Sequence, residues 1–358
     1  MRGAGQDSRV AGGDTTAART LVFICDGTLS TTAEGARSNA GRLARLLAEV
    51  GPRRGQAALY HPGIQGTGVA RWLNAATGRT IDHGIMAGYA FLASRYRPGD
   101  RICLFGYSRG AYAVRSLAGM IGKIGLLSAE HATERNVVQA LRLYRACSPA
   151  DGRRRAPKMR DAFARRFCRQ GVEIEVLGVW DTVRALGLPV PFVDRLMPDD
   201  HTFHDDALGP HIRHGYHALA LHETRAVYTP VLWRKSPHWQ GRLEQCWFPG
   251  NHGDVGGEVR CQPDARGLSN ISLNWMLRRA ARHGITLPTD WESRFAEDAS
   301  APSTAGASAL EWLTMPRTRR QTGAGDGEII HLSVRTRAAG LTLPPPQALP
   351  PGFSSGRA

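Results

Sequence analysis

The chain has 358 residues, with 46 Lys and Arg against 31 Asp and Glu, so its formal net charge is +15. Apolar residues make up 42 % and charged residues 22 %, which excludes a wholly disordered chain. No run of about 18 apolar residues occurs, and residues 1–19 lack the apolar segment of a secretory signal, so we expect a protein that is cytoplasmic as synthesised.

The positive charge is carried almost wholly by arginine, because Lys123, Lys158 and Lys235 are the only lysines. The arginines are spread along the chain, whereas a nucleic-acid-binding protein gathers its basic residues on one face. We therefore expect no nucleic-acid partner, and an arginine-rich nucleic-acid binder is the least favoured alternative. A diffuse positive charge does suit contact with an anionic membrane surface.

The predicted elements alternate between apolar runs and segments of helical periodicity. Residues 1–19 show no periodicity and are expected to form a flexible leader. Strands are expected at 21–25, 57–60, 101–105, 172–180 and 243–248, and helices at 37–50, 81–92 and 111–121. This order predicts an α/β fold with a mostly parallel sheet and helices on both faces.

Two stretches interrupt this alternation. Residues 183–215 hold four prolines and many His and Asp, and they suit a cap or lid inserted into a single domain that spans 20–340. Residues 341–358 are rich in proline and are expected to form an extended tail.

The sequence Gly106-Tyr107-Ser108-Arg109-Gly110 is a G-x-S-x-G motif. An apolar strand leads into it and a helical pattern leads out of it, which is the setting of the nucleophile elbow in α/β-hydrolases. Gly106 and Gly110 are expected because a side chain at either position would collide with neighbouring backbone. The alternative is a tight turn with an incidental serine.

A nucleophilic serine needs a histidine to take its proton and a carboxylate to orient that histidine. Asp181 directly follows the strand at 172–180, and His252 lies in a glycine-rich loop after the strand at 243–248. The order Ser108, Asp181, His252 is the order of α/β-hydrolase triads. His331 also follows a short apolar run and is the alternative base.

An oxyanion hole needs two backbone N–H donors. We expect one from Arg109 and the second from Gly27 or Thr28, in the turn after the first strand, with Asp26 and Asp254 as supporting residues. Asp26-Gly27-Thr28 also resembles part of a phosphatase motif, but that motif needs an aspartate at the position of Ile24.

No cofactor is expected, since neither a phosphate-binding loop nor a dinucleotide fingerprint occurs. Six histidines crowd residues 201–222 without the spacing of a zinc site, so we expect no metal there and interpret them as residues of a cap.

Several blocks of the sequence resemble an uncharacterised α/β-hydrolase domain family that includes the catalytic domains of type VI secretion phospholipase effectors. The blocks are FICDGT at 23–28, YHPGIQGTG at 60–68, FLASRYRPGDRICLFGYSRGAYAVRSLAGMI at 91–121, VWDTVRALGLP at 179–189, HALALHETRAVYTPVLW at 217–233, WFPGNHGDVGG at 247–257 and HLSVRTR at 331–337.

This resemblance implies a serine esterase of the phospholipase type, with Ser108 as nucleophile, Asp181 as acid and His252 as base. It also implies export by a type VI system and a secretion-apparatus or immunity protein as partner. A catalytically silent binding module with the hydrolase fold is the alternative from another functional class.

Overall fold

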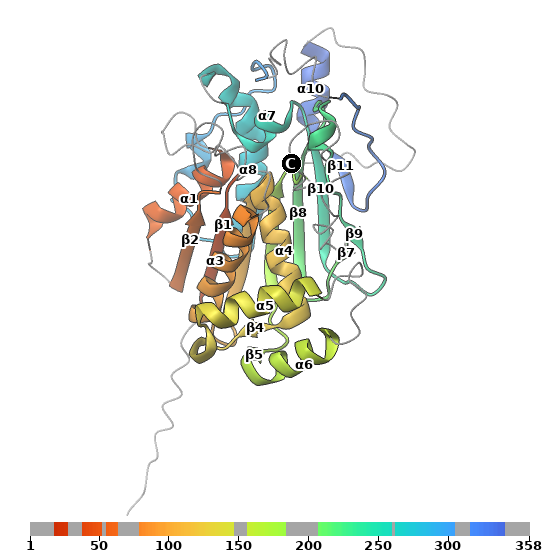
Figure 1. The fold of residues 1–358 in the computed structure, drawn as a ribbon. Helices are drawn as coiled ribbons and strands as arrows, with labels where there is room; N and C mark the ends of the chain where they lie inside the picture. The colour runs from red at the N-terminus through yellow and green to blue at the C-terminus, as the bar shows by residue number, and fades with distance from the viewer. Residues whose placement is uncertain are drawn as a thin grey trace, which may run out of the picture.

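The computed structural model describes residues 18–27, 38–51, 55–63, 79–146, 156–183, 207–259, 262–304 and 316–340 (Figure 1). The strands are β1 (Thr20–Cys25), β2 (Gln56–His61), β3 (Arg101–Tyr107), β4 (Leu126–Leu127), β5 (Cys168–Arg169), β6 (Ile174–Trp180), β7 (Ala207–Leu208), β8 (Ile212–Ala220), β9 (Arg234–Lys235), β10 (Arg242–Phe248) and β11 (Glu328–Ile330). The helices are α1 (Asn39–Val50), α3 (Arg79–Arg95), α4 (Arg109–Ile124), α5 (Glu134–Ala146), α6 (Ala156–Phe167), α7 (His252–Gly256), α8 (Arg266–Arg282) and α10 (Leu332–Gly340).

Seven strands form one sheet in the order β11-β10-β8-β6-β3-β1-β2, and every neighbouring pair is parallel. This confirms the predicted α/β fold with a parallel sheet. From β1 the chain moves first to β2 on one side and then to β3 on the other. Ligands of parallel sheets bind beyond the carboxyl ends of the strands near such a reversal, and β3 leads into Ser108.

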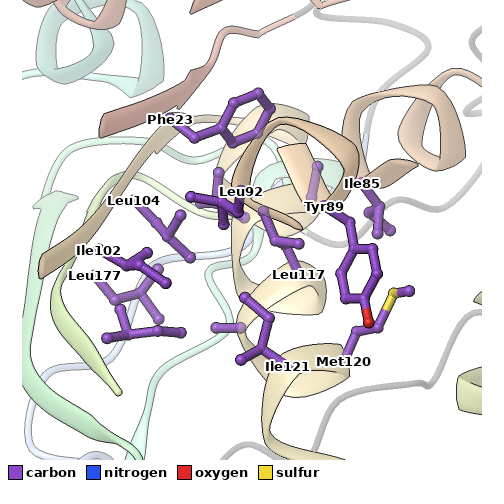
Figure 2. Packing of buried hydrophobic residues seen from close by; sticks show 14 of the residues in the cluster. Phe23, Ile85, Tyr89, Leu92, Ile102, Leu104, Leu117, Met120, Ile121 and Leu177 are labelled. Atoms are coloured by element: carbon purple, nitrogen blue, oxygen red, sulfur yellow. The ribbon is translucent and has the colours of Figure 1, made fainter. Parts of the chain in front are cut away.

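Helices cover both faces of the sheet because alternate residues of each strand point to opposite sides. Phe23 of β1 belongs to a buried cluster with side chains of α3 and α4, whereas Ile24 belongs to a cluster with side chains of α1 and α8. Figure 2 shows the first cluster, in which Leu104 and Leu177 of the strands pack toward Leu117 of α4.

The predicted helix at 37–50 shows how local sequence defines an element. Ser38 is the N-cap of α1, and its Oγ accepts a hydrogen bond from the N–H of Gly41 at 3.0 Å. Leu43, Leu46 and Leu47 recur at helical spacing and are buried.

The prediction for residues 183–215 is partly wrong. Residues 184–206 lie outside the described residues, but Ile212–Ala220 is β8, a largely buried strand between β6 and β10 and the third strand from the β11 edge of the sheet. His214, Gly215 and His217 interrupt the apolar run that marks a buried strand, so the sequence pattern hid it.

The predicted ends of the domain are only partly described. Thr20 begins β1, and the preceding Arg19 forms an ion pair with Asp100 at 2.5 Å. Residues 1–17 of the leader predicted at 1–19, and the predicted tail at 341–358, lie outside the described residues. Among the helices that the structure describes, none has the length and apolar character needed to cross a bilayer.

Candidate active site

Ser108 lies in a sharp turn between β3 and α4. Its φ of 55° and ψ of −120° are unusual for a residue with a side chain. A Cβ added at Gly106 would lie 2.5 Å from Gly110 O, and one added at Gly110 would lie 2.1 Å from Cys25 O. These close backbone approaches explain why glycine occupies both positions around the serine.

The strain at Ser108 gives a stability prediction. Glycine adopts a positive φ with little cost, whereas alanine carries the same Cβ penalty as serine. We expect Ser108→Gly to be more stable than Ser108→Ala by about 1 kcal/mol, as measured by urea unfolding. Equal stability of the two variants would contradict the strained turn.

Asp181 is the residue after β6, and it too has a positive φ, of 41°. Its carboxylate is fully buried. Oδ1 accepts a hydrogen bond from the N–H of Ala220, the last residue of β8, at 3.0 Å. The adjacent strand therefore fixes the direction in which the carboxylate points.

His252 begins α7, the short helix that follows β10. Asn251 and Asp254 form a capping box: each side chain accepts a hydrogen bond from the backbone N–H of the other, at 3.0 and 2.9 Å. Asp254 also accepts hydrogen bonds from Ser303 and Thr304. The position of His252 is therefore fixed by the capping box and by the hydrogen bonds from residues 303 and 304 to Asp254.

The structure brings Ser108, Asp181 and His252 together in one hydrogen-bonded chain. Ser108 Oγ lies 2.9 Å from His252 Nε2, and His252 Nδ1 lies 2.6 Å from Asp181 Oδ2. All three side chains lie beyond the carboxyl ends of parallel strands, β3, β6 and β10. Asp181 and Ser108 are 71 and 144 residues away from His252 in the sequence, and the parallel sheet brings all three together.

The imidazole of His252 stacks with two tyrosine rings. Tyr107 stacks on it with ring centroids 5.0 Å apart, and Tyr228 stacks at 4.6 Å. Glu223 Oε2 accepts a hydrogen bond from the backbone N–H of His252 at 3.2 Å. These contacts restrict the imidazole to the plane that reaches both Ser108 and Asp181.

Arg320 forms a second contact with the Asp181 carboxylate. Nη1 lies 2.5 Å from Oδ1 and Nη2 lies 2.9 Å from Oδ2. Burial by itself would raise the pKa of Asp181, but Arg320 and then His252 outweigh it and hold that pKa well below its usual range. The carboxylate is therefore ionised.

The turn after β1 lies next to the serine. Asp26 is buried and accepts hydrogen bonds from Ser38 Oγ at 2.6 Å and from Tyr60 OH at 2.7 Å. A Cβ added at Gly27 would lie 3.3 Å from the Cβ of Ser108, but the Gly27 N–H donates to Asp26 Oδ1 at 2.7 Å. Its predicted role as an oxyanion donor, like that of Arg109, stays a prediction, and Thr28 lies outside the described residues.

His331, the alternative base, lies in another environment. Its ring stacks on Phe248 at 4.8 Å, and Nδ1 lies 2.8 Å from Ser333 Oγ. Burial, with help from Arg279 and Arg278, lowers the pKa of His331 to about 4. The contact with Ser108 Oγ is made by His252.

The histidines of residues 201–222 have different environments. His201 and His204 lie outside the described residues, and His211 and His222 contact the backbone at Ala118 and Gly250. Only His214, among the described residues, joins a group with metal-ligand character, with Glu175 and His283 within 4.8 Å. That group lies at the amino ends of β6 and β8, opposite Ser108, and Arg213 is 3.5 Å from Glu175, which disfavours a cation.

His217 of β8 is fully buried next to Thr182, the residue that follows Asp181. The Thr182 N–H donates to Nε2 at 3.1 Å, so the Nδ1 proton points to Gln245 Oε1 at 3.4 Å. Burial first, and then the charge of Arg115, lower the pKa of His217 to about 3. The folded protein therefore keeps this histidine neutral, whereas the unfolded chain protonates it below about pH 6.5.

A stability prediction follows from this difference. Between about pH 6.5 and pH 3 the unfolded state binds one more proton at His217, so stability falls as the pH falls, by up to about 1.4 kcal/mol per pH unit. We expect His217→Gln to flatten that slope in urea unfolding at pH values across this window. His238→Gln, at an exposed position, is the control, and an unchanged slope in His217→Gln would contradict the assignment.

The sequence did not single out Arg320, Tyr228 or Glu223. Arg320 stands in a run with Arg317 and Arg319 that has no periodicity. Glu223 and Tyr228 fall in the block at 217–233 that resembles the family, but nothing in that block assigned either residue a role. Nothing in the order of residues marks which arginine of such a run is buried. Arg320 is 139 residues away from Asp181 in the sequence, and only the folded structure shows that the two side chains are in contact.

The chain is similar to a known family of catalytic domains and to a curated protein of yeast. The family described as "T6SS, Phospholipase effector Tle1-like, catalytic domain" matches residues 19–279. The uncharacterised protein YEL023C of Saccharomyces cerevisiae is 28 % identical over 239 residues, which cover 62 % of this chain and 33 % of that protein. This chain thus spans about a third of that curated relative.

Two solved structures show weaker similarity. An uncharacterised protein from Pseudomonas aeruginosa has a TM-score of 0.43 at 20 % identity, over 79 % of this chain and 49 % of that one. The Tle1 effector bound to the VgrG spike of the type VI secretion system has a TM-score of 0.33 at 18 % identity, over 73 % and 57 %. Because the family match extends over most of the chain, the protein belongs to the family of Tle1-like type VI secretion phospholipase effector catalytic domains.

Proposed function

We propose that the protein is a serine hydrolase that cleaves the carboxyl esters of phospholipids through an acyl-enzyme. The hydrogen-bonded chain from Ser108 Oγ through His252 to Asp181 is the observation that carries this proposal. The strained turn at Ser108 and membership of a phospholipase effector family support it.

The geometry suggests a role for each group. Ser108 Oγ attacks the ester carbonyl while its proton passes to His252 Nε2, and the ionised Asp181 stabilises the imidazolium that results. His252 then protonates the departing alcohol, leaving the acyl group on Ser108. Water, deprotonated by the same histidine, attacks the acyl-enzyme and releases the fatty acid.

The amino end of α4 favours negative charge on the tetrahedral intermediate. Arg109 is the first residue of this 16-residue helix, and its N–H is our candidate for one oxyanion donor. The Ser108 N–H is already used, because it donates to Trp180 O at 3.0 Å. The second donor is proposed to come from the turn at Gly27 and Thr28. The Gly27 N–H donates to Asp26 Oδ1 at 2.7 Å, so it would have to exchange that acceptor for the substrate oxygen.

Two of the three exposed large apolar side chains among the described residues lie near the carboxyl ends of the strands, and the third, Met159, lies on α6. Val227, 38 % exposed, precedes the Tyr228 that stacks on His252, and Leu332, 61 % exposed, follows the carboxyl end of β11. We propose that this edge meets the surface of an anionic membrane, where the positive charge of the chain adds attraction. By analogy with its family, we also propose export from the cytoplasm with a secretion-spike protein as partner and an immunity protein as inhibitor.

Lipid products test the proposed reaction directly. The protein is incubated with vesicles of mixed phosphatidylcholine and phosphatidylglycerol, and the products are separated by mass spectrometry. We expect free fatty acid and lysophospholipid in equal amounts. Diacylglycerol or phosphatidate as the product would contradict carboxyl-ester cleavage, because these arise when a phosphoester bond is cleaved. Absence of any product would favour the catalytically silent binding module.

A further inference from the structure

An arginine from the C-terminal part of the chain covers the carboxylate of the proposed triad. Arg320 contacts both oxygens of Asp181, at 2.5 and 2.9 Å, and its side chain is only 2 % exposed. The family match ends at residue 279, so this contact comes from outside the matched residues. Arg320 is therefore a fourth side chain in contact with the proposed triad, through Asp181.

The backbone around Arg320 is held against the loop that follows β8. Pro316 O accepts from the Ala226 N–H at 2.9 Å, and the Thr318 N–H donates to Thr224 O at 2.7 Å. The guanidinium itself donates to Ala220 O at 2.7 Å and to Tyr228 O at 2.5 Å. It thus ties Asp181 to the residue that ends β8 and to the tyrosine that stacks on His252.

Two ion pairs balance the charge around His252. Asp181 is paired with Arg320, and Glu223, which accepts from the His252 N–H, is paired with Arg225 at 2.6 Å. The two carboxylates that accept hydrogen bonds from His252 are therefore each paired with one arginine. The other ionisable groups that act on this set are Asp26, Tyr107, Arg109, Arg115, His217, Tyr228, Asp254 and Glu258.

We propose that Arg320 is a positioning residue that orients Asp181 toward His252 and extends catalysis to lower pH, an inference that rests on the proposed function. The bidentate contact fixes both carboxylate oxygens, so Oδ2 stays directed at His252 Nδ1. The positive charge opposes protonation of the neighbouring imidazole. Without it, one uncompensated carboxylate would stabilise the imidazolium, and the fraction of enzyme with a free base would fall in mild acid.

The charge and the geometry of Arg320 can be separated by two substitutions. Arg320→Met removes both, whereas Arg320→Lys keeps the charge but not the planar bidentate contact. The pH profile of hydrolysis of p-nitrophenyl butyrate is measured for each variant. Arg319→Met, at the exposed neighbouring position, is the matched control.

The expected results differ among the variants. For Arg320→Met the acid limb of kcat/KM moves to higher pH by about one unit. Its kcat on the plateau falls at least about tenfold with little change in KM. Arg320→Lys keeps the wild-type acid limb with a reduced kcat, and Arg319→Met resembles the wild type. If Arg320→Met fails to fold, a shifted acid limb in folded Arg320→Lys contradicts the proposal.

A readout independent of turnover separates this inference from the proposed function. The Nδ1 proton that His252 donates to Asp181 is expected to give a low-field proton NMR signal, which is assigned by its loss in His252→Gln. We expect this signal to titrate at higher pH in Arg320→Met than in the wild type, whether or not esters are cleaved. An unchanged titration together with an unchanged acid limb, and only a lower melting temperature, would show a purely structural role for Arg320.

Discussion

Ser108→Ala is expected to lower the rate of ester hydrolysis by about four orders of magnitude or more. Removal of the nucleophile leaves only substrate binding and oxyanion stabilisation, which account for a small part of the rate of such enzymes. KM should change little, because Ser108 Oγ contacts the reacting carbonyl and not the rest of the lipid. The rate is measured with p-nitrophenyl butyrate and with phospholipid vesicles.

Ser116→Ala provides a control on the same helix. Ser116 is also buried, but its Oγ donates to Tyr112 O, one turn back in α4, at 3.1 Å. We expect this variant to retain activity close to that of the wild type. Equal activity of Ser108→Ala and the wild type would show that another group carries the reaction.

Asp181→Asn is expected to reduce both activity and stability. The amide cannot accept from Ala220, Arg320 and His252 together, so His252 loses the orientation of Nε2 toward Ser108, and kcat should fall by about four orders of magnitude. The substitution also leaves the Arg320 charge buried without its partner, which should cost about 3–5 kcal/mol of unfolding free energy. Hydrolysis rates and urea unfolding measure the two effects.

An exposed aspartate is the control for this loss of stability. Asp290 pairs with Arg294 on the surface at 2.7 Å, and its side chain is 59 % exposed. Because solvent screens such a pair, Asp290→Asn should leave stability and activity nearly unchanged. Similar losses in both aspartate variants would contradict a special role for the buried pair.

The destabilisation by Asp181→Asn should depend on pH. The pKa of Asp181 is lowered on folding, since Arg320 and His252 outweigh the effect of burial. Its contribution to stability is therefore present above the carboxyl pKa of the unfolded chain, about 3.9, and is lost as the pH falls toward the lower pKa of the folded state. The difference in unfolding free energy between wild type and variant should be largest near neutral pH and shrink below about pH 4.

The residues of the proposed triad could be found from sequence because of where parallel strands end. Each comes at or shortly after the end of a strand that is mainly apolar, and the carboxyl ends of such strands meet at one edge of the sheet. Gly106 and Gly110 could also be predicted, because the tight turn around Ser108 leaves no space for a side chain at either position. The strands β1, β3, β6 and β10 lie within a few residues of their predicted ranges.

The residues that sequence reasoning missed depend on contacts between distant segments. β8 carries His214 and His217 in its interior, and His217 is tolerated because Thr182 and Gln245 satisfy both ring nitrogens. Arg320 was counted as part of a diffuse arginine charge. In the structure Arg320 forms a buried ion pair with Asp181. This contact arises because residues 316–320 pack against the loop after β8.

Covalent labelling tests the central claim most directly, because a fluorophosphonate reacts only with an activated serine. The native protein is treated with the reagent, its intact mass is measured, and the modified peptide is sequenced by mass spectrometry. We predict one adduct, on Ser108, that is lost in Ser108→Ala and retained in Ser116→Ala. Absence of labelling in the native protein, or an adduct on another serine that persists in Ser108→Ala, would contradict the proposed triad.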